Sequence, residues 1–182
     1  VSTDAKLREE GSKCEEDLGQ FMVGVFTRKD LYQALKLVNP KRGAVARLHQ
    51  ETLKAFEKNG LKLSDEKLAE LKALLSEISR NETKFSANLN NDVTTLTFTA
   101  AELDGVPASF LSRAQKNGAG DYIITTKSSD YVVVMENAKS AATRKKMLTA
   151  YLKRGTYENT ELLEKNIVLR AQAAQVLGYN TW

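Results

Sequence analysis

Apolar and polar positions follow a helical period most clearly over residues 64–91. The apolar residues recur mostly at steps of three and four, which places them on one face of a helix of about seven to eight turns. Ser64 is placed to cap the first turn, and Asp65 and Glu66 lie where the helix dipole favours negative charge. Because a long helix with one apolar side needs partners, we expect a helical assembly built along it. The apolar face consists of Leu68, Leu71, Leu75, Ile78, Phe85 and Leu89.

The same reasoning predicts three helices before the long one. The first covers residues 3–26, with Thr3 or Asp4 as its cap. A short helix over 28–38 ends at Asn39-Pro40, because proline cannot donate to a preceding turn and disfavours a helical residue before it. A third helix over 44–58 ends at Asn59-Gly60. The residues predicted to face inward are Leu7, Cys14, Leu18, Phe21, Met22 and Val25 in the first helix, and Val45, Leu48, Thr52, Ala55 and Phe56 in the third.

After the long helix the period changes to that of strands. Residues 93–98 and 122–126 are rich in β-branched residues and predict two strands that pair as a small ribbon. Between them we expect a turn capped by Thr99, a short helix over 106–114 and a loop. The segment 129–137 stays open, because Val132-Val133-Val134 favours a strand whereas inward Tyr131, Val134 and Met135 favour a helix.

Two further helices complete the pattern, one over 140–154 with Ser140 as its cap and one over 159–177. Their inward residues are predicted to be Met147, Leu148, Tyr151 and Leu152, and then Leu163, Ile167, Ala171, Ala174 and Leu177. The fold class is therefore mainly α, a multi-helix domain around a long central helix (64–91) with a small two-stranded β ribbon. We expect one domain over residues 1–182.

Composition places few further limits on the chain. It has 182 residues, of which 42% are hydrophobic and 27% charged, as is ordinary for globular proteins. The net charge of +4 is too small to indicate a nucleic-acid partner. The single cysteine, Cys14, excludes an intrachain disulfide. No apolar run approaches the roughly 20 residues that cross a bilayer, so we expect no membrane partner.

Groups with catalytic chemistry are scarce. His49 is the only histidine, whereas a helical zinc site of the His-Glu-x-x-His kind needs two imidazoles one turn apart. We interpret His49 as a surface or helix-packing residue and Cys14 as a buried structural thiol. Gly118-Ala119-Gly120 is not followed by Lys-Ser/Thr, so we interpret it as a turn and not as a phosphate loop. We therefore expect no catalytic, cofactor-binding or metal-binding residue in this chain.

Charged clusters allow two interpretations. The carboxylates of Glu9-Glu10 and Glu15-Glu16-Asp17 are typical of solvated helix faces. Two basic clusters could bind phosphate or peptide carboxylate, or could equally be solvated faces. We favour solvated faces, because acidic residues are interspersed elsewhere and no aromatic platform accompanies the cations. The first basic cluster is Lys41, Arg42 and Arg47, and the second is Arg144, Lys145, Lys146, Lys153 and Arg154.

The chain begins at Val1 and ends at Trp182 without a charged tail, and from this we expect a fragment of a longer protein. A series of short motifs along the chain has a familiar order. The series comprises Arg28-x-Asp30-Leu-Tyr32, Asn59-Gly-Leu61 with Leu63, Phe85-x-x-Asn88-Leu-Asn-x-Asp92, Phe98-Thr-x-x-Glu102-Leu-x-Gly105-x-Pro107-x-x-Phe110-Leu111, Thr143-Arg-Lys-Lys146, Leu169-Arg-Ala-Gln172 and Leu177-Gly-Tyr179. Together these motifs resemble the amino-terminal region of the thimet oligopeptidase, neurolysin and saccharolysin family.

The resemblance implies a mostly helical zinc metallopeptidase that cuts short peptides in a deep channel between two lobes. The family's zinc helix, with His-Glu-x-x-His and a further glutamate, lies downstream of the matched region, and this sequence contains none of it. The resemblance thus implies a non-catalytic lobe that forms one channel wall and is inactive alone, with zinc held elsewhere in the parent enzyme. It also implies that 129–137 is helical.

The implied partners are the catalytic lobe and short peptides, in the cytoplasm or in mitochondria. A stand-alone helical peptide-binding or scaffold module is the alternative. A gene that continues into a His-Glu-x-x-His helix would favour the peptidase, and a gene that stops near Trp182 would favour the module.

Overall fold

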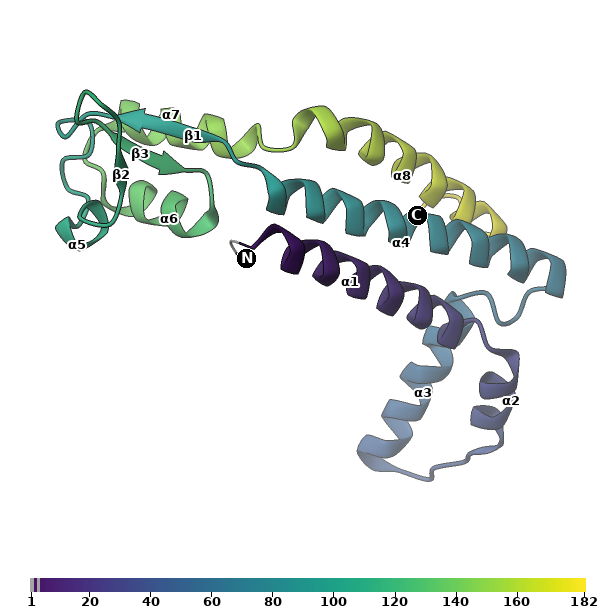
Figure 1. Cartoon of the computed structure of the whole chain (residues 1–182). Helices are drawn as coiled ribbons and strands as arrows, with labels where there is room; N and C mark the ends of the chain where they lie inside the picture. The colour runs from purple at the N-terminus through teal and green to yellow at the C-terminus, as the bar shows by residue number, and fades with distance from the viewer. Residues whose placement is uncertain (1, 3) are drawn as a thin grey trace. The chain divides into compact units, whose positions relative to one another are not determined.

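The computed structural model describes Ser2 and residues 4–182, and in these residues the chain forms eight helices and a small antiparallel sheet (Figure 1). The chain divides into two compact units. The first runs to Ala87 and resumes at Asn159, and the second covers Asn88–Glu158. The prediction of a mainly α fold with a long helix near residues 64–91 is confirmed. The expectation of a single domain stays a prediction.

Five helices contribute to the first unit, and their ends agree with the predicted ones within three residues. They are α1 (Ala5–Phe26), α2 (Lys29–Leu37), α3 (Gly43–Lys58), α4 (Asp65–Asn91) and α8 (Thr156–Val176). Asp4 caps α1, because its carboxylate accepts from the backbone N–H groups of Lys6 and Leu7 at 2.9 and 3.3 Å. The alternative cap, Thr3, lies outside the described residues. Gly60 ends α3 with a φ of +87°.

The core of the first unit lies where α1, α2, α3 and the start of α4 meet. Tyr32, Phe56, Leu61 and Leu68 are buried there, and the rings of Phe26 and Phe56 are 5.4 Å apart. In α4 the predicted face is confirmed, since Leu68, Leu71 and Ile78 are buried. Aromatic and leucine side chains from four segments therefore hold this end of the unit together.

The predicted inner face of α1 is largely wrong, whereas that of α3 is right towards its end, where Phe56 is buried, and wrong at its start. Leu7, Leu18, Phe21 and Met22 of α1 are exposed, with Phe21 at 63%, and Val45 and Leu48 of α3 are exposed as well. The side of α1 that meets α4 is polar and small instead. There the amide of Gln20 donates to the carbonyl of Ser76 at 3.0 Å, and a Cβ on Gly19 would lie 2.5 Å from the hydroxyl of Ser79. A pattern of apolar residues cannot reveal a contact of this kind.

The predicted face of α8 is right at Ala174, which is buried, but wrong earlier in the helix for a related reason. Leu163 and Ile167 are half exposed or more, whereas Asn166 is buried and accepts a hydrogen bond from Asn81 of α4 at 2.9 Å. The amide of Asn159 donates to the carbonyl of Phe85 at 3.1 Å. These polar bonds, together with the buried alanines 173 and 174, fix which side of α8 meets α4.

The second unit is built on a three-stranded antiparallel sheet in the order β1-β3-β2. Its strands are β1 (Thr95–Phe98), β2 (Gln115–Lys116) and β3 (Tyr122–Thr125). The two longer strands form the predicted ribbon, with Thr95 opposite Thr125 and Phe98 opposite Tyr122. The two-residue strand β2 was not predicted, because it is too short and too polar to show a period of its own.

Three helices pack beside this sheet: α5 (Ala108–Leu111), α6 (Ser128–Asn137) and α7 (Ala141–Leu152). The segment that was ambiguous in sequence, α6, is a helix, and its Val134 is fully buried in the core of the unit. Leu152, predicted inward, is 70% exposed. The core of the unit consists of Phe98, Leu103, Val106, Ile124, Val134, Ala138 and Met147.

Candidate functional site

The structure places the predicted chemical residues apart from one another. His49 is half-buried in α3, and its Nε2 lies 2.8 Å from the carbonyl oxygen of Leu35, so it joins α3 to α2 as predicted. Cys14 is exposed on α1, and the prediction of a buried thiol is wrong because α1 turns its polar side to α4. Gly118-Ala119-Gly120 lies in a turn, as predicted, between β2 and β3.

The second basic cluster is largely occupied by contacts inside its own unit. The guanidinium of Arg144 donates to the carbonyl of Lys139 at 2.9 Å, and the ammonium of Lys146 donates to the carbonyl of Thr97 at 2.7 Å. The guanidinium of Arg154 donates to the carbonyl of Thr126 at 3.1 Å and lies 3.7 Å from the centre of the Tyr151 ring. These cations support the local fold, so they do not form a free anion-binding strip. Lys145 and Lys153 are exposed.

The first basic cluster lies where the chain turns from α2 into α3. Lys41, Arg42 and Arg47 are exposed, and none of the three has an ion-pair partner among the described residues. They do not line the cavity at the end of α3 or the one between α1 and α4. Exposed side chains are compatible with a solvated surface and with an anion-binding one, so the interpretation that we favoured stays a prediction.

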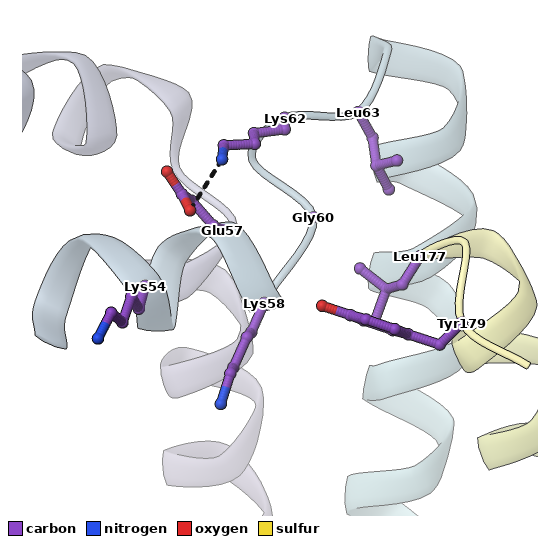
Figure 2. Close-up of a pocket in the computed structure, with 8 residues that line it drawn as sticks. All are labelled: Lys54, Glu57, Lys58, Gly60, Lys62, Leu63, Leu177 and Tyr179. Carbon is purple, nitrogen blue, oxygen red and sulfur yellow. Dashed lines mark ion pairs between the residues drawn. The ribbon is translucent and has the colours of Figure 1, made fainter. Parts of the chain in front are cut away.

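A cavity with a charged lining lies in the first unit, between the end of α3, the loop after it and the end of α8 (Figure 2). Its volume is about 270 Å³. We call it the lysine pocket, because three of its lining side chains are lysines. It is lined by Lys54, Glu57, Lys58, Gly60, Lys62, Leu63, Leu177 and Tyr179.

Local sequence explains how these residues come together. Gly60 turns the chain out of α3 with its positive φ, and a Cβ there would lie 2.5 Å from a methyl carbon of Leu71, so the loop lies close against α4. At the end of α8 the backbone N–H of Tyr179 donates to the carbonyl of Ala174 at 2.8 Å. This bond returns the chain over the end of the helix and brings Leu177 and Tyr179 to the pocket.

One carboxylate balances part of the positive charge. Glu57 accepts from the hydroxyl of Tyr32 at 3.1 Å and pairs with Lys62 at 2.9 Å. The bond from Lys62 holds the pKa of Glu57 below its usual value, against the opposing effect of burial, and in return Glu57 raises the pKa of Lys62. Lys54 pairs with Glu51 at 3.2 Å in an exposed contact, and Lys58 has no partner among the described residues. The lining therefore carries three ammonium groups and one carboxylate that is already bound.

A larger and less charged hollow of about 540 Å³ lies in the second unit, between the sheet, α5 and α6. Its lining includes the apolar Ile123 and Val133 and the charged Arg113 and Asp130. The carboxylate of Asp130 accepts from both the N–H and the hydroxyl of Thr125, at 3.2 and 2.6 Å. Asp130 and Thr125 thus bind each other.

Sequence reasoning missed the lysine pocket. Lys54, Lys58 and Lys62 recur at steps of four, a spacing that could have been noticed, but Gly60 interrupts the helix between the last two. Tyr179 is more than a hundred residues away in sequence, and no pattern links it to them. Among the described residues there is no cluster of three or more metal-ligating side chains. None of the helices described is long and apolar enough to cross a lipid bilayer.

Comparison with known proteins yields a consistent set of relatives, although no model of a protein family matches the chain. A thimet-like oligopeptidase of Dictyostelium discoideum is 35% identical over 100% of this chain and 29% of its own length. A probable thimet oligopeptidase of Arabidopsis thaliana is 30% identical over 98% of this chain and 26% of its own length. Oligopeptidase A of Haemophilus influenzae is 30% identical over 100% of this chain and 30% of its own length. The chain thus spans between a quarter and a third of the length of these relatives.

Proposed function

Because the chain belongs to the thimet oligopeptidase family and corresponds to the amino-terminal part of its longer members, we propose that it is the non-catalytic lobe of a peptidase for short peptides. In this proposal the lobe forms one wall of the substrate channel. The observation that carries the proposal is the match of the whole chain to only 26–30% of each relative.

Zinc belongs to the part of the enzyme outside these residues. A His-Glu-x-x-His helix needs two histidines, and this chain has one. The imidazole of that histidine contacts the carbonyl of Leu35. The chain's own contribution is therefore to shape and bound the space that peptides enter, while the metal and its general base act from the other lobe.

Exposed apolar residues support a partner for this lobe. Leu18 and Phe21 of α1 are 59% and 63% exposed, and Leu163 and Ile167 of α8 are 50% and 58% exposed. Apolar side chains that recur along one helix face and are left in water usually mark a contact surface. The proposed partner for these faces is the remainder of the peptidase.

Curated relatives include both cytosolic and organellar forms. On that basis we propose the cytoplasm as the compartment of this protein, with an organelle such as the mitochondrion as the alternative. Fractionation of cells that express the tagged protein would distinguish the two, and recovery mainly in organelles would contradict the first.

Peptide hydrolysis by the longer polypeptide that the gene encodes tests the proposal. We expect it to cleave an internally quenched peptide of about ten residues and to lose that activity with a zinc chelator, regaining it when zinc is restored. A folded globular protein, such as lysozyme, serves as the control for size selection and should be cut far more slowly. Absence of peptide cleavage by the longer polypeptide, or a gene that stops near Trp182, would support the stand-alone module instead.

A further inference from the structure

The lysine pocket has an excess of positive charge that no internal contact uses. Glu57 is its only carboxylate, and this group already accepts from Tyr32 and pairs with Lys62. Lys58 is exposed and has no partner among the described residues, and Lys54 has only a solvent-exposed contact with Glu51. An exposed pair of that kind contributes little to stability, so its lysine is available to another anion.

The opposite wall of the pocket is apolar. Leu63 and Leu177 line it, and in Figure 2 the ring of Tyr179 lies beside Leu177 with its hydroxyl directed towards the end of α3. That hydroxyl has no hydrogen-bond partner among the described residues, so it can donate to a ligand. A ligand that fits both walls combines an anionic group with an aliphatic one.

The size of the pocket limits the ligand further. About 270 Å³ corresponds to roughly nine water molecules at about 30 Å³ each, which is room for a single residue and not for a folded segment. An inorganic phosphate would satisfy the lysines but would leave the leucine wall in water. The carboxylate and side chain of one terminal residue would cover both walls.

We propose that the lysine pocket binds the C-terminal residue of an oligopeptide, with its carboxylate on Lys58 and the hydroxyl of Tyr179 and its aliphatic side chain on Leu63 and Leu177. This assignment rests on the proposed function, since that function supplies the peptides. It adds to that function a place at which the end of a peptide is held apart from the site of cleavage.

The test measures binding to the ¹⁵N-labelled 182-residue chain by NMR, with N-acetyl-leucine as the probe. We expect the amide signals of Gly60, Gly178 and Tyr179 to shift with a Kd in the millimolar range, as is normal for so small a ligand. N-acetyl-leucinamide has the same side chain without the charge and should bind at least about tenfold more weakly. Acetate and phosphate lack the side chain and should also bind more weakly.

Two variants assign the contacts. Lys58→Gln should weaken binding about tenfold, and Tyr179→Phe, which removes only the hydroxyl, should weaken it a few-fold. Lys145→Gln is the matched control, because Lys145 is an exposed lysine of the second unit. It should leave the Kd unchanged. Circular dichroism confirms that each variant is folded.

Equal binding of the acid and the amide, equal binding of phosphate and N-acetyl-leucine, or equal Kd values for Lys58→Gln and Lys145→Gln would each overturn the assignment. The measurement involves no hydrolysis. A negative binding result therefore does not contradict the peptidase proposal. If the longer polypeptide shows no peptidase activity, the binding measurement can still be interpreted.

Discussion

Asn81 and Asn166 contribute a buried side-chain hydrogen bond to the contact between α4 and α8. The two amides satisfy each other at 2.9 Å in surroundings where water cannot easily replace either one. The free energy lost when a buried amide has no partner is larger than the free energy gained from the hydrogen bond. The pair therefore chiefly determines which face of α8 packs against α4. This explains why α8 leaves Ile167 exposed.

Removal of one of these amides should therefore destabilise the first unit. We expect Asn81→Ala to lower the free energy of unfolding by about 1–3 kcal/mol, because Asn166 then stays buried without its donor. Urea denaturation followed by circular dichroism measures the change. Asn180→Ala removes an exposed asparagine as a control and should alter the free energy by less than about 0.5 kcal/mol. Equal values for the two variants would contradict the assignment.

Asp92 plays a similar part in the second unit. Its carboxylate accepts from the backbone N–H groups of Thr94 and Gly155, at 2.9 and 3.3 Å, and so joins the start of β1 to the segment after α7. Burial raises the pKa of Asp92, but these hydrogen bonds and the one from the hydroxyl of Thr126 together lower it by more. The pKa of Asp92 therefore lies below its usual value of 3.8.

The direction of this shift sets a pH dependence. Because the folded state lowers the pKa of Asp92, the stabilisation is fully present above the unfolded pKa and is lost as the pH falls through the folded pKa. We expect Asp92→Asn to lower the free energy of unfolding by about 1–2 kcal/mol at pH 7. The difference from the wild type should shrink as the pH falls below about 4. A difference that is constant from pH 7 to pH 2.5 would rule out the ionised carboxylate as its cause.

Sequence patterns predicted where helices start and end far better than they predicted which helix faces are buried. Asn39-Pro40, Asn59-Gly60 and Gly155 are local signals, and the helices end near each of them as predicted. Burial depends on contacts between segments, which the apolar pattern reports only when the contact itself is apolar. It succeeded for Leu68, Leu71 and Ile78 of α4. It failed for most of α1 and for the first half of α8, whose contacts use glutamine, glycine and asparagine.

The lysine pocket was beyond sequence reasoning for the same cause. Its lining comes from residues 54–63 and from Leu177 and Tyr179, which lie more than a hundred residues further along the chain, and the position of Tyr179 depends on a backbone bond to Ala174. By contrast, the environment of His49 was predictable. It is the only histidine and lies within a helix between Leu48 and Gln50, so a two-histidine metal site was excluded and helix packing was expected. Chemistry that one element supplies can be inferred from sequence, whereas chemistry assembled from several elements needs the fold.

The turn at Gly105 packs closely against the end of α6. Gly105 has a φ of +94°, and a Cβ there would lie 2.3 Å from the carbonyl oxygen of Asn137 at the end of α6. We expect Gly105→Ala to cost at least about 2 kcal/mol of unfolding free energy, since both the backbone and its neighbour must move. Gly118→Ala, where no atom lies within 4 Å, is the matched control and should be nearly neutral. A midpoint of thermal unfolding shared by the two variants would refute this account.

For the molecule as a whole, exposed apolar residues on α1 and α8 predict association at high concentration. We expect the mass of the 182-residue chain measured by light scattering to rise with concentration, since these faces can cover one another in the absence of another partner. Phe21→Glu combined with Ile167→Glu places charge on both faces and should keep the mass at that of one chain, 20.2 kDa. A mass that is independent of concentration in the wild type would contradict the prediction.

The central claim is that these residues shape a peptidase without carrying out its chemistry, and one assay tests it directly. The 182-residue chain is incubated with zinc and an internally quenched oligopeptide, beside the longer polypeptide at the same molar concentration. We predict no turnover above the buffer rate for the chain alone and rapid turnover for the longer polypeptide. Zinc-dependent cleavage by the 182-residue chain itself would contradict the claim.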